Sequence, residues 1–245
     1  MPMTTILPLV NIAMDGFRGL GKLELESLGR VNVLVGGNNS GKTSVLEAIS
    51  ILAEPGDPAA WMDMIRWRDP GRIDESRLHS FRWCFYRDLG KSNEMDEFWG
   101  GSCSFSAEGN YSLRRLDVNY QEIAGQPSSD ELKNLYPDLY GSNAGLMELL
   151  KLKSPSGQVS GNNELKGGEI EHSIETASGV FHTDVYRIWD GADTWRRASR
   201  LSSQVPKLRC GVLAAYSYQN NIHQTSTLSA AIDLTDEPSL VSLLQ

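Results

Sequence analysis

The residues best placed to do chemistry are a lysine and two hydroxyl side chains that follow a glycine-rich loop. Residues 36–44 read Gly-Gly-Asn-Asn-Ser-Gly-Lys-Thr-Ser and fill every fixed position of the pattern G-x-x-x-x-G-K-[ST]. Glycines let backbone N–H groups converge on one anion, and a helix N-terminus adds partial positive charge. The stretch therefore predicts a nucleotide phosphate site, with Lys42 on the β/γ-phosphates and Thr43 on Mg²⁺. The expected contact residues are Gly36, Gly37, Asn38, Asn39, Ser40, Gly41, Lys42, Thr43 and Ser44.

Two elements must position this loop, a buried strand before it and a helix after it. The apolar run at residues 31–35 predicts the strand, and Gly41-Lys42-Thr43 opens the helix, which Pro55-Gly56 ends. Helical spacing predicts a buried face of Val45, Leu46, Ile49, Leu52 and Ala53, with Glu47 and Ser50 on the other face.

The rest of the chain predicts a mixed α/β fold with a twisted mixed sheet around that first helix and a β-rich flank. Strands are expected at residues 7–14, 22–26, 81–86, 102–106, 111–118, 168–176, 180–189 and 208–216. Glycine-containing turns at residues 108–110 and 177–179 predict two hairpins. Helices are expected at residues 61–67 and 144–152, and residues 154–168 predict a mobile loop.

Composition describes a globular chain of 245 residues, 40% hydrophobic and 22% charged. A net charge of -8 without a long basic run argues against a stand-alone basic nucleic-acid module, although one local face or an assembly could still bind DNA. Three scattered cysteines predict reduced thiols and a cytoplasmic protein. Neither a signal peptide nor a membrane span is expected.

The order of apolar strand, Phe17-Arg18-Gly19-Leu20, alternating strand and phosphate loop resembles the N-terminus of ABC-type ATPase heads. The SMC, RecF and OLD (overcoming lysogenisation defect) ATPases share this order. The loop followed by Val-Leu-Glu-Ala-Ile looks most like the OLD-related branch, which includes bacterial anti-phage ATPases. The specific resemblance covers residues 7–52, about one fifth of the chain.

This resemblance implies a P-loop ATPase head that uses ATP and Mg²⁺. It also implies a homodimer or higher oligomer formed through the nucleotide site, and action on DNA or on a nuclease or toxin effector. Arg18 would lie near the nucleotide, or else be an exposed arginine in a turn. Gln219 would contact Mg²⁺, or else be a polar loop residue.

Such heads also need a Walker B strand and a serine-glycine signature helix. The Ser-Gly-Gln fragment at residues 156–158 predicts a loop, and residues 185–190 predict a strand ending in a turn at Asp190. We therefore expect the missing motifs beyond Gln245, so that the C-terminal half of the head is absent. Residues 1–56 would form the phosphate-loop core, 57–205 β-rich and helical inserts, and 206–245 a return to the core.

Two other functions remain open. A stand-alone P-loop kinase or GTPase is one, although a GTPase needs Asn-Lys-x-Asp and residues 93–96 lack the lysine. A subunit whose ATP is structural is the other. For the leading hypothesis, the full-length protein should hydrolyse ATP, whereas these 245 residues should bind it with negligible turnover.

Overall fold

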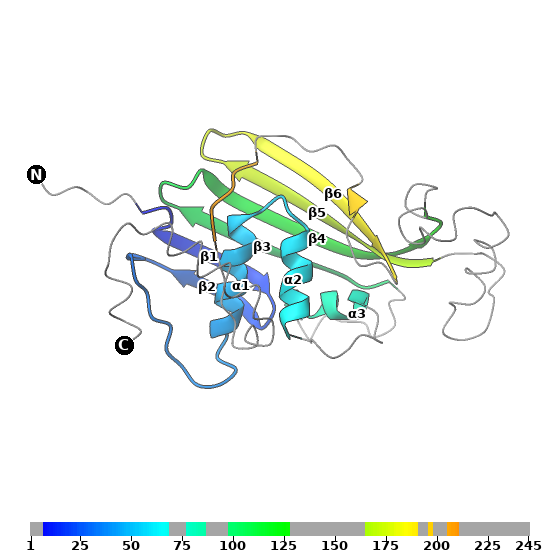
Figure 1. Cartoon of the computed structure of the whole chain (residues 1–245), viewed down its shortest axis with the longest axis horizontal. Helices are drawn as coiled ribbons and strands as arrows, with labels where there is room; N and C mark the ends of the chain where they lie inside the picture. Colours follow the sequence, from blue (N-terminus) through cyan, green and yellow to red (C-terminus); the bar gives the residue numbers. More distant parts are fainter. Residues whose placement is uncertain are drawn as a thin grey trace, which may run out of the picture.

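The computed structural model describes residues 7–68, 77–86, 98–127, 165–190, 196–197 and 205–210. These residues form an α/β arrangement of one sheet and three helices (Figure 1). The strands are β1 (Asn11–Phe17), β2 (Leu20–Leu25), β3 (Gly100–Glu108), β4 (Leu113–Gly125), β5 (Leu165–Thr176), β6 (Phe181–Trp189) and β7 (Arg196–Arg197). The helices are α1 (Lys42–Ala53), α2 (Ala59–Arg68) and α3 (Arg77–Arg82).

The sheet is antiparallel throughout, in the order β2-β1-β3-β4-β5-β6-β7. The expectation of a mixed sheet is therefore wrong for the described strands, whereas the mixed α/β composition is confirmed. The predicted hairpins are β3–β4 and β5–β6, which turn at Gly109 (φ 145°) and Gly179 (φ 74°). A tight turn reverses the chain, so strands joined by one must pair antiparallel.

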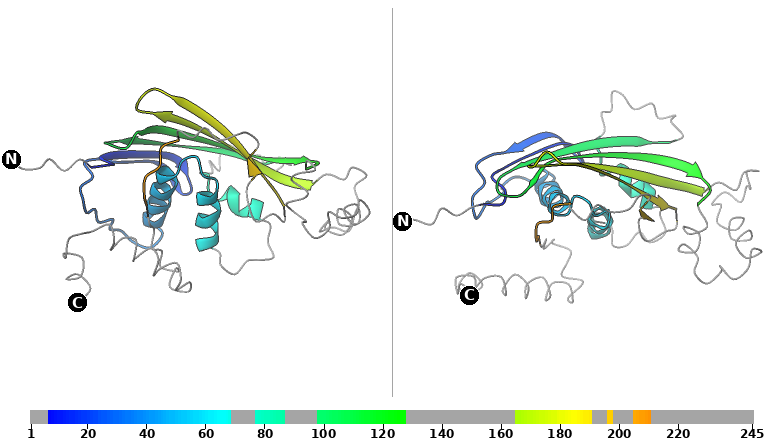
Figure 2. Two further views of the ribbon diagram at one scale, coloured as in Figure 1. Left: turned by 45° about the horizontal axis from the view of Figure 1, so that its top comes forward. Right: turned by 90° about the horizontal axis from the view of Figure 1, so that it is seen from above.

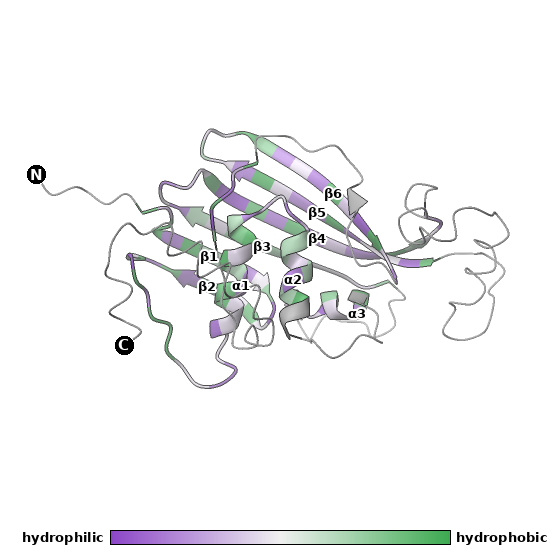
Figure 3. Ribbon diagram, viewed as in Figure 1, coloured by the Kyte–Doolittle hydropathy of each residue, from purple (hydrophilic) through white to green (hydrophobic). Residues whose placement is uncertain are grey.

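All three helices lie on the same face of the sheet (Figures 1 and 2). Along β5, Ile170, His172 and Ile174 point to this face and are fully buried, whereas Glu171 and Ser173 between them remain partly exposed. The same alternation colours the strands in stripes in Figure 3. A period of two is typical of strands with one buried face, which explains why sequence alternation located them.

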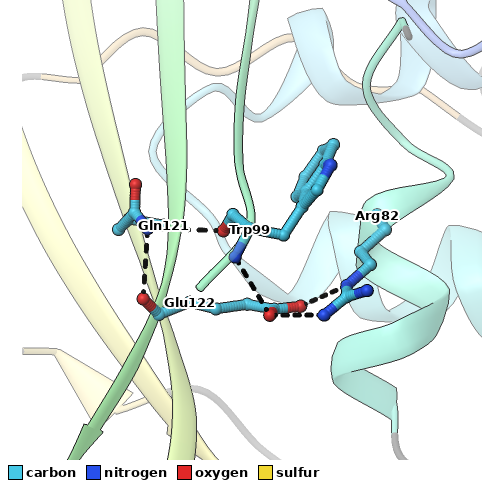
Figure 4. Close-up of polar contacts among 4 residues, drawn as sticks. All are labelled: Arg82, Trp99, Gln121 and Glu122. Carbon is cyan, nitrogen blue, oxygen red and sulfur yellow. Dashed lines mark hydrogen bonds and ion pairs between the residues drawn. The ribbon is translucent and has the colours of Figure 1, made fainter. Parts of the chain in front are cut away.

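Aromatic rings fill the space between helices and sheet. Trp61 of α2 stacks on Phe85 with ring centroids 5.8 Å apart, and Phe85 stacks on Tyr120 of β4 at 5.5 Å. On α3, Arg82 makes a two-point ion pair with Glu122 of β4, at 2.5 and 2.6 Å (Figure 4). Glu122 also accepts a hydrogen bond from the backbone N–H of Trp99. One carboxylate of β4 therefore contacts both α3 and the residue that precedes β3.

The expected strand at residues 31–35 is not formed. This segment is irregular, and Val31, Val33 and Val35 are 84%, 77% and 86% exposed. It leaves β2 and loops away from the sheet before α1 begins (Figure 1). Within the described ranges no strand pairs with it, and an extended segment without a partner has only water for its backbone groups. Only Leu34 of this segment packs against the core.

The expected strand at residues 81–86 is also wrong, because α3 and a turn occupy most of it. Phe81, Cys84 and Phe85 are buried, whereas Trp83 and Tyr86 are 58% and 49% exposed. Only the first two residues of the segment belong to α3. The helix predicted at residues 61–67 is confirmed as α2. The helix expected at 144–152 lies outside the described residues, as do most of the loop expected at 154–168 and of the strand expected at 208–216; residues 165–168 belong to β5.

Candidate functional site

The glycines at the fixed positions of the loop leave little room for a Cβ. Gly41 has φ 87°, and a Cβ there would lie 2.7 Å from Cδ2 of Leu20. A Cβ at Gly36 would lie 2.6 Å from Oγ of Ser40. Gly37 occupies a variable position of the motif, and no described atom lies within 4 Å of a Cβ built there. The structural need for glycine thus follows the motif itself.

The side chain of Lys42 folds back over the loop. Its Nζ donates to the carbonyl oxygens of Gly36 and Gly37 at 2.9 and 2.7 Å and to Oγ of Ser40 at 3.3 Å. The ammonium group is therefore held at the loop by three oxygens from the loop itself. This places a positive charge where a phosphate bound by the loop would lie.

The N-terminus of α1 offers further donors for an anion. Gly41 is its N-cap residue, no described side chain caps the helix there, and its first turn holds no acidic residue. The first N–H groups of a helix lack carbonyl partners within the helix, and its dipole favours negative charge at this end. Thr43 is exposed, so its hydroxyl is accessible to a metal ion bound beside a phosphate. Residues 36–43 therefore fit a nucleotide phosphate.

Arg18 is not the exposed turn arginine that the sequence left open. It lies in the turn between β1 and β2 with φ 53°, and its side chain is 9% exposed. Its Nε lies 2.9 Å from Oε2 of Glu47, whose side chain is 3% exposed. The guanidinium carbon also lies 5.8 Å from the ring centroid of Phe17. The structure thus directs Arg18 toward Glu47 of α1.

The predicted buried and exposed faces of α1 are wrong at Leu46 and Glu47. The expectation was that Glu47 would be exposed and Leu46 buried, but Glu47 is buried and Leu46 is 44% exposed. The buried charge is tolerated because Arg18 lies opposite it. The other buried residues of α1 include Val45, Leu52 and Ala53, as predicted.

Sequence reasoning missed the tyrosines that hold the other end of α1. The Tyr111 hydroxyl lies 3.0 Å from the carbonyl oxygen of Leu52 and 3.1 Å from that of Pro206. The hydroxyl of Tyr186 on β6 donates to the carbonyl of Gly56, just beyond the helix. Burial raises the pKa of Tyr111, so this hydroxyl keeps its proton for donation. The only sequence signal was their place in the strands expected at residues 111–118 and 180–189.

The remaining predicted positions add nothing to the site. Gln219 lies outside the described residues. Asp190 follows β6, where its backbone N–H donates to the carbonyl of Lys166, as expected for a strand that ends in a turn. Within the described ranges, His, Cys, Asp and Glu side chains form no group of three that could hold a metal ion. Nor does this part of the chain contain a helix long and apolar enough to cross a membrane.

Comparison with known proteins adds evidence from outside the chain. Residues 31–123 match the family described as "AAA domain, putative AbiEii toxin, Type IV TA system". An uncharacterized protein, MJECL10, of Methanocaldococcus jannaschii is 45% identical over 41 residues, which are 17% of this chain and 19% of that protein. The DNA replication and repair protein RecF of a Marinomonas species is 49% identical over 47 residues, 19% of this chain and 13% of RecF.

The matches to curated relatives therefore cover less than a fifth of the length of each of these two proteins. No solved structure matches the chain. The family match begins at the exposed segment before the phosphate loop and includes the loop, α1, α2 and the β3–β4 hairpin. Together with the partial match to RecF, it supports an ABC- or AAA-type ATPase lobe that binds nucleotide.

Proposed function

We propose that the chain is the phosphate-loop lobe of an ABC-type ATPase of the SMC/RecF/OLD-like group, which binds ATP with Mg²⁺. The observation that carries this proposal is the ammonium of Lys42, held over the loop by the carbonyls of Gly36 and Gly37 at an uncapped helix N-terminus. Backbone N–H groups of residues 36–44 would hold the phosphates, and Thr43 would supply a hydroxyl to Mg²⁺. Bound Mg²⁺ would neutralise charge on the phosphates during transfer.

We further propose that the lobe dimerises through nucleotide and drives an effector that acts on DNA or in defence against phage. The matched family's description names a toxin, and the matched RecF is named for DNA replication and repair. These two names support an effector that acts in defence or on DNA, without choosing between them. Cytoplasmic location and an OLD-type architecture belong to the same proposal.

Calorimetry on the folded 245-residue chain tests nucleotide binding directly. Lys42→Ala removes a charge-assisted contact to phosphate, which typically contributes about 1.5–3 kcal/mol, so ATP affinity should fall tenfold or more. Lys22→Ala is the matched control, because this lysine of β2 has a side chain 71% exposed and pairs with Glu24. Equal ATP affinity for wild type and Lys42→Ala would refute the proposal. A strong preference for GTP over ATP would instead favour the GTPase alternative.

A further inference from the structure

We infer that the turn between β1 and β2, residues 17–20, positions the phosphate loop through the Arg18–Glu47 ion pair and the Leu20–Gly41 contact. This inference rests on the proposed function, because it concerns how the same nucleotide site is held in shape. It assigns positioning roles to Arg18, Leu20 and Glu47, none of which needs to touch the nucleotide.

The turn is itself firmly anchored to the body of the protein. The backbone N–H of Arg18 donates to the carbonyl of Cys84 at 2.9 Å, and that of Tyr86 donates to the carbonyl of Gly16 at 2.6 Å. Phe17 is fully buried, and its ring meets the ring of Trp61 edge to face at 6.1 Å. The turn can therefore act as a fixed support for whatever rests on it.

Arg18 has a left-handed backbone conformation, which is energetically unfavourable for a residue with a side chain. A residue with a Cβ rarely adopts φ 53°, and it persists only where the surroundings determine it. Here this conformation lets Arg18 and Leu20 both reach α1 from one short turn. Glycine follows at position 19, where no described atom lies within 4 Å of an added Cβ.

The two contacts fall at different heights on the helix. Leu20 meets Gly41 at the N-cap, and Arg18 meets Glu47 six positions later, about 9 Å along the axis at 1.5 Å per residue. Two separated points fix the rotation of a helix as well as its position. Because Gly41 and Lys42 belong to both the loop and the helix start, fixing α1 fixes the direction of the loop's donors.

The ion pair is well suited to this task because it is buried. The side chains of Arg18 and Glu47 are 9% and 3% exposed, so water screens the attraction weakly. Removing either partner would take away the charge that lies closest to the other in this buried pair, which is unfavourable. Glu47 lies about 7.5 Å along the helix axis from Lys42, five residues at 1.5 Å each, so Arg18 is directed away from the first turn.

The experiment measures ATP affinity and thermal stability for the 245-residue chain and its Arg18→Gln, Glu47→Gln and double variants. If the pair positions the loop, each single variant should lower ATP affinity about three- to tenfold, and the double variant should be no worse than either. Arg18→Lys should recover part of the loss because it keeps the charge. Leu20→Ala tests the second contact without burying an unpaired charge, and should also lower affinity.

Arg82→Gln is the matched control. It breaks a different partly buried ion pair, between Arg82 of α3 and Glu122 of β4 (Figure 4). It should lower the melting temperature while ATP affinity stays at the wild-type value. A purely structural Arg18–Glu47 pair would behave in the same way, so unchanged affinity in Glu47→Gln would overturn the inference.

Two further results separate the alternatives. A much larger loss for Arg18→Gln than for Glu47→Gln, with additive effects in the double variant, would mean that Arg18 contacts phosphate directly and would also overturn the inference. NMR of the nucleotide-free protein supplies a readout independent of ATP: Glu47→Gln should shift the amide signals of Gly41 and Lys42, and Arg82→Gln should not. If wild type binds no ATP but these signals move as expected, the proposed function fails and the positioning role stands.

Discussion

The phosphate loop and the antiparallel sheet are held in place in different ways. Residues 36–40 are exposed, and this part of the chain is shaped by a few specific contacts, such as the bonds from Lys42 Nζ to loop carbonyls. The sheet is held by continuous ladders from β2 to β6 and by a packed aromatic layer that includes Trp61, Phe85 and Tyr120.

This difference teaches that stability and binding reside in separate sets of residues. Loss of one ring from the aromatic layer is felt by the whole fold, since interiors are close-packed. Loss of one loop contact would change the proposed nucleotide site while most of the core remains intact. The Arg18–Glu47 pair and Leu20 lie where the two regions meet, because they link the β1–β2 turn to α1.

The largest expected effect on stability comes from truncating the aromatic layer. Trp61 is fully buried against Phe17 and Phe85, so Trp61→Ala should lower the free energy of unfolding by about 3–5 kcal/mol. Urea titration followed by circular dichroism measures this. Trp83→Ala is the control, because that ring is 58% exposed and its loss should cost much less. Equal losses would show that the aromatic layer is not the source of stability.

A smaller effect is expected at the junction of loop and helix. Gly41→Ala forces a Cβ into left-handed backbone, at about 1–2 kcal/mol, and also against Leu20, so both stability and ATP affinity should fall. Gly37→Ala enters open space and should leave the free energy of unfolding unchanged within about 0.5 kcal/mol. Denaturant titration and calorimetry on the pair provide the comparison. If both alanines behave alike, the loop does not have the backbone described above.

The smallest effect, counted per pH unit, is a pH dependence of stability that comes from His172 of β5. His172 is fully buried, and burial lowers its pKa to about 3 from an ordinary value of 6.5, with the carbonyl of Pro55 opposing the shift. Between these values the unfolded chain binds a proton that the folded chain does not. Its contribution to stability is therefore complete above pH 6.5 and is lost as pH falls, by at most about 1.4 kcal/mol per pH unit.

NMR titration of the imidazole checks this directly, since its signals should stay unchanged down to about pH 4 in the folded protein. Asp184 lies opposite His172 in the β5–β6 ladder. His172→Leu removes the imidazole and keeps Asp184, so it shows how much of the pH dependence comes from the histidine. That variant should lose part of the decline in stability between pH 6.5 and 5. A histidine that titrates near 6.5 in the folded state would contradict the assignment.

Local sequence patterns determined much of this molecule. Alternating side chains and glycine turns located the β3–β4 and β5–β6 hairpins, because a strand with one buried face must repeat every two residues. The phosphate-loop motif identified Gly36, Gly41 and Lys42, whose roles depend on backbone conformation and on a side chain a few residues away. Both kinds of signal are contained within a short stretch of chain.

Only the tertiary structure decided what depends on distant partners. An apolar run such as residues 31–35 becomes a strand only where another strand pairs with it, and among the described residues none does. The segment at 81–86 leaves α3 after Arg82 and continues as a turn to Phe85, which bridges to Phe17, so contacts with distant residues and not local pattern decided its conformation. Glu47 reads as a solvated residue in the sequence, yet it is buried, because Arg18 lies beside it from a turn 29 residues earlier and compensates its charge.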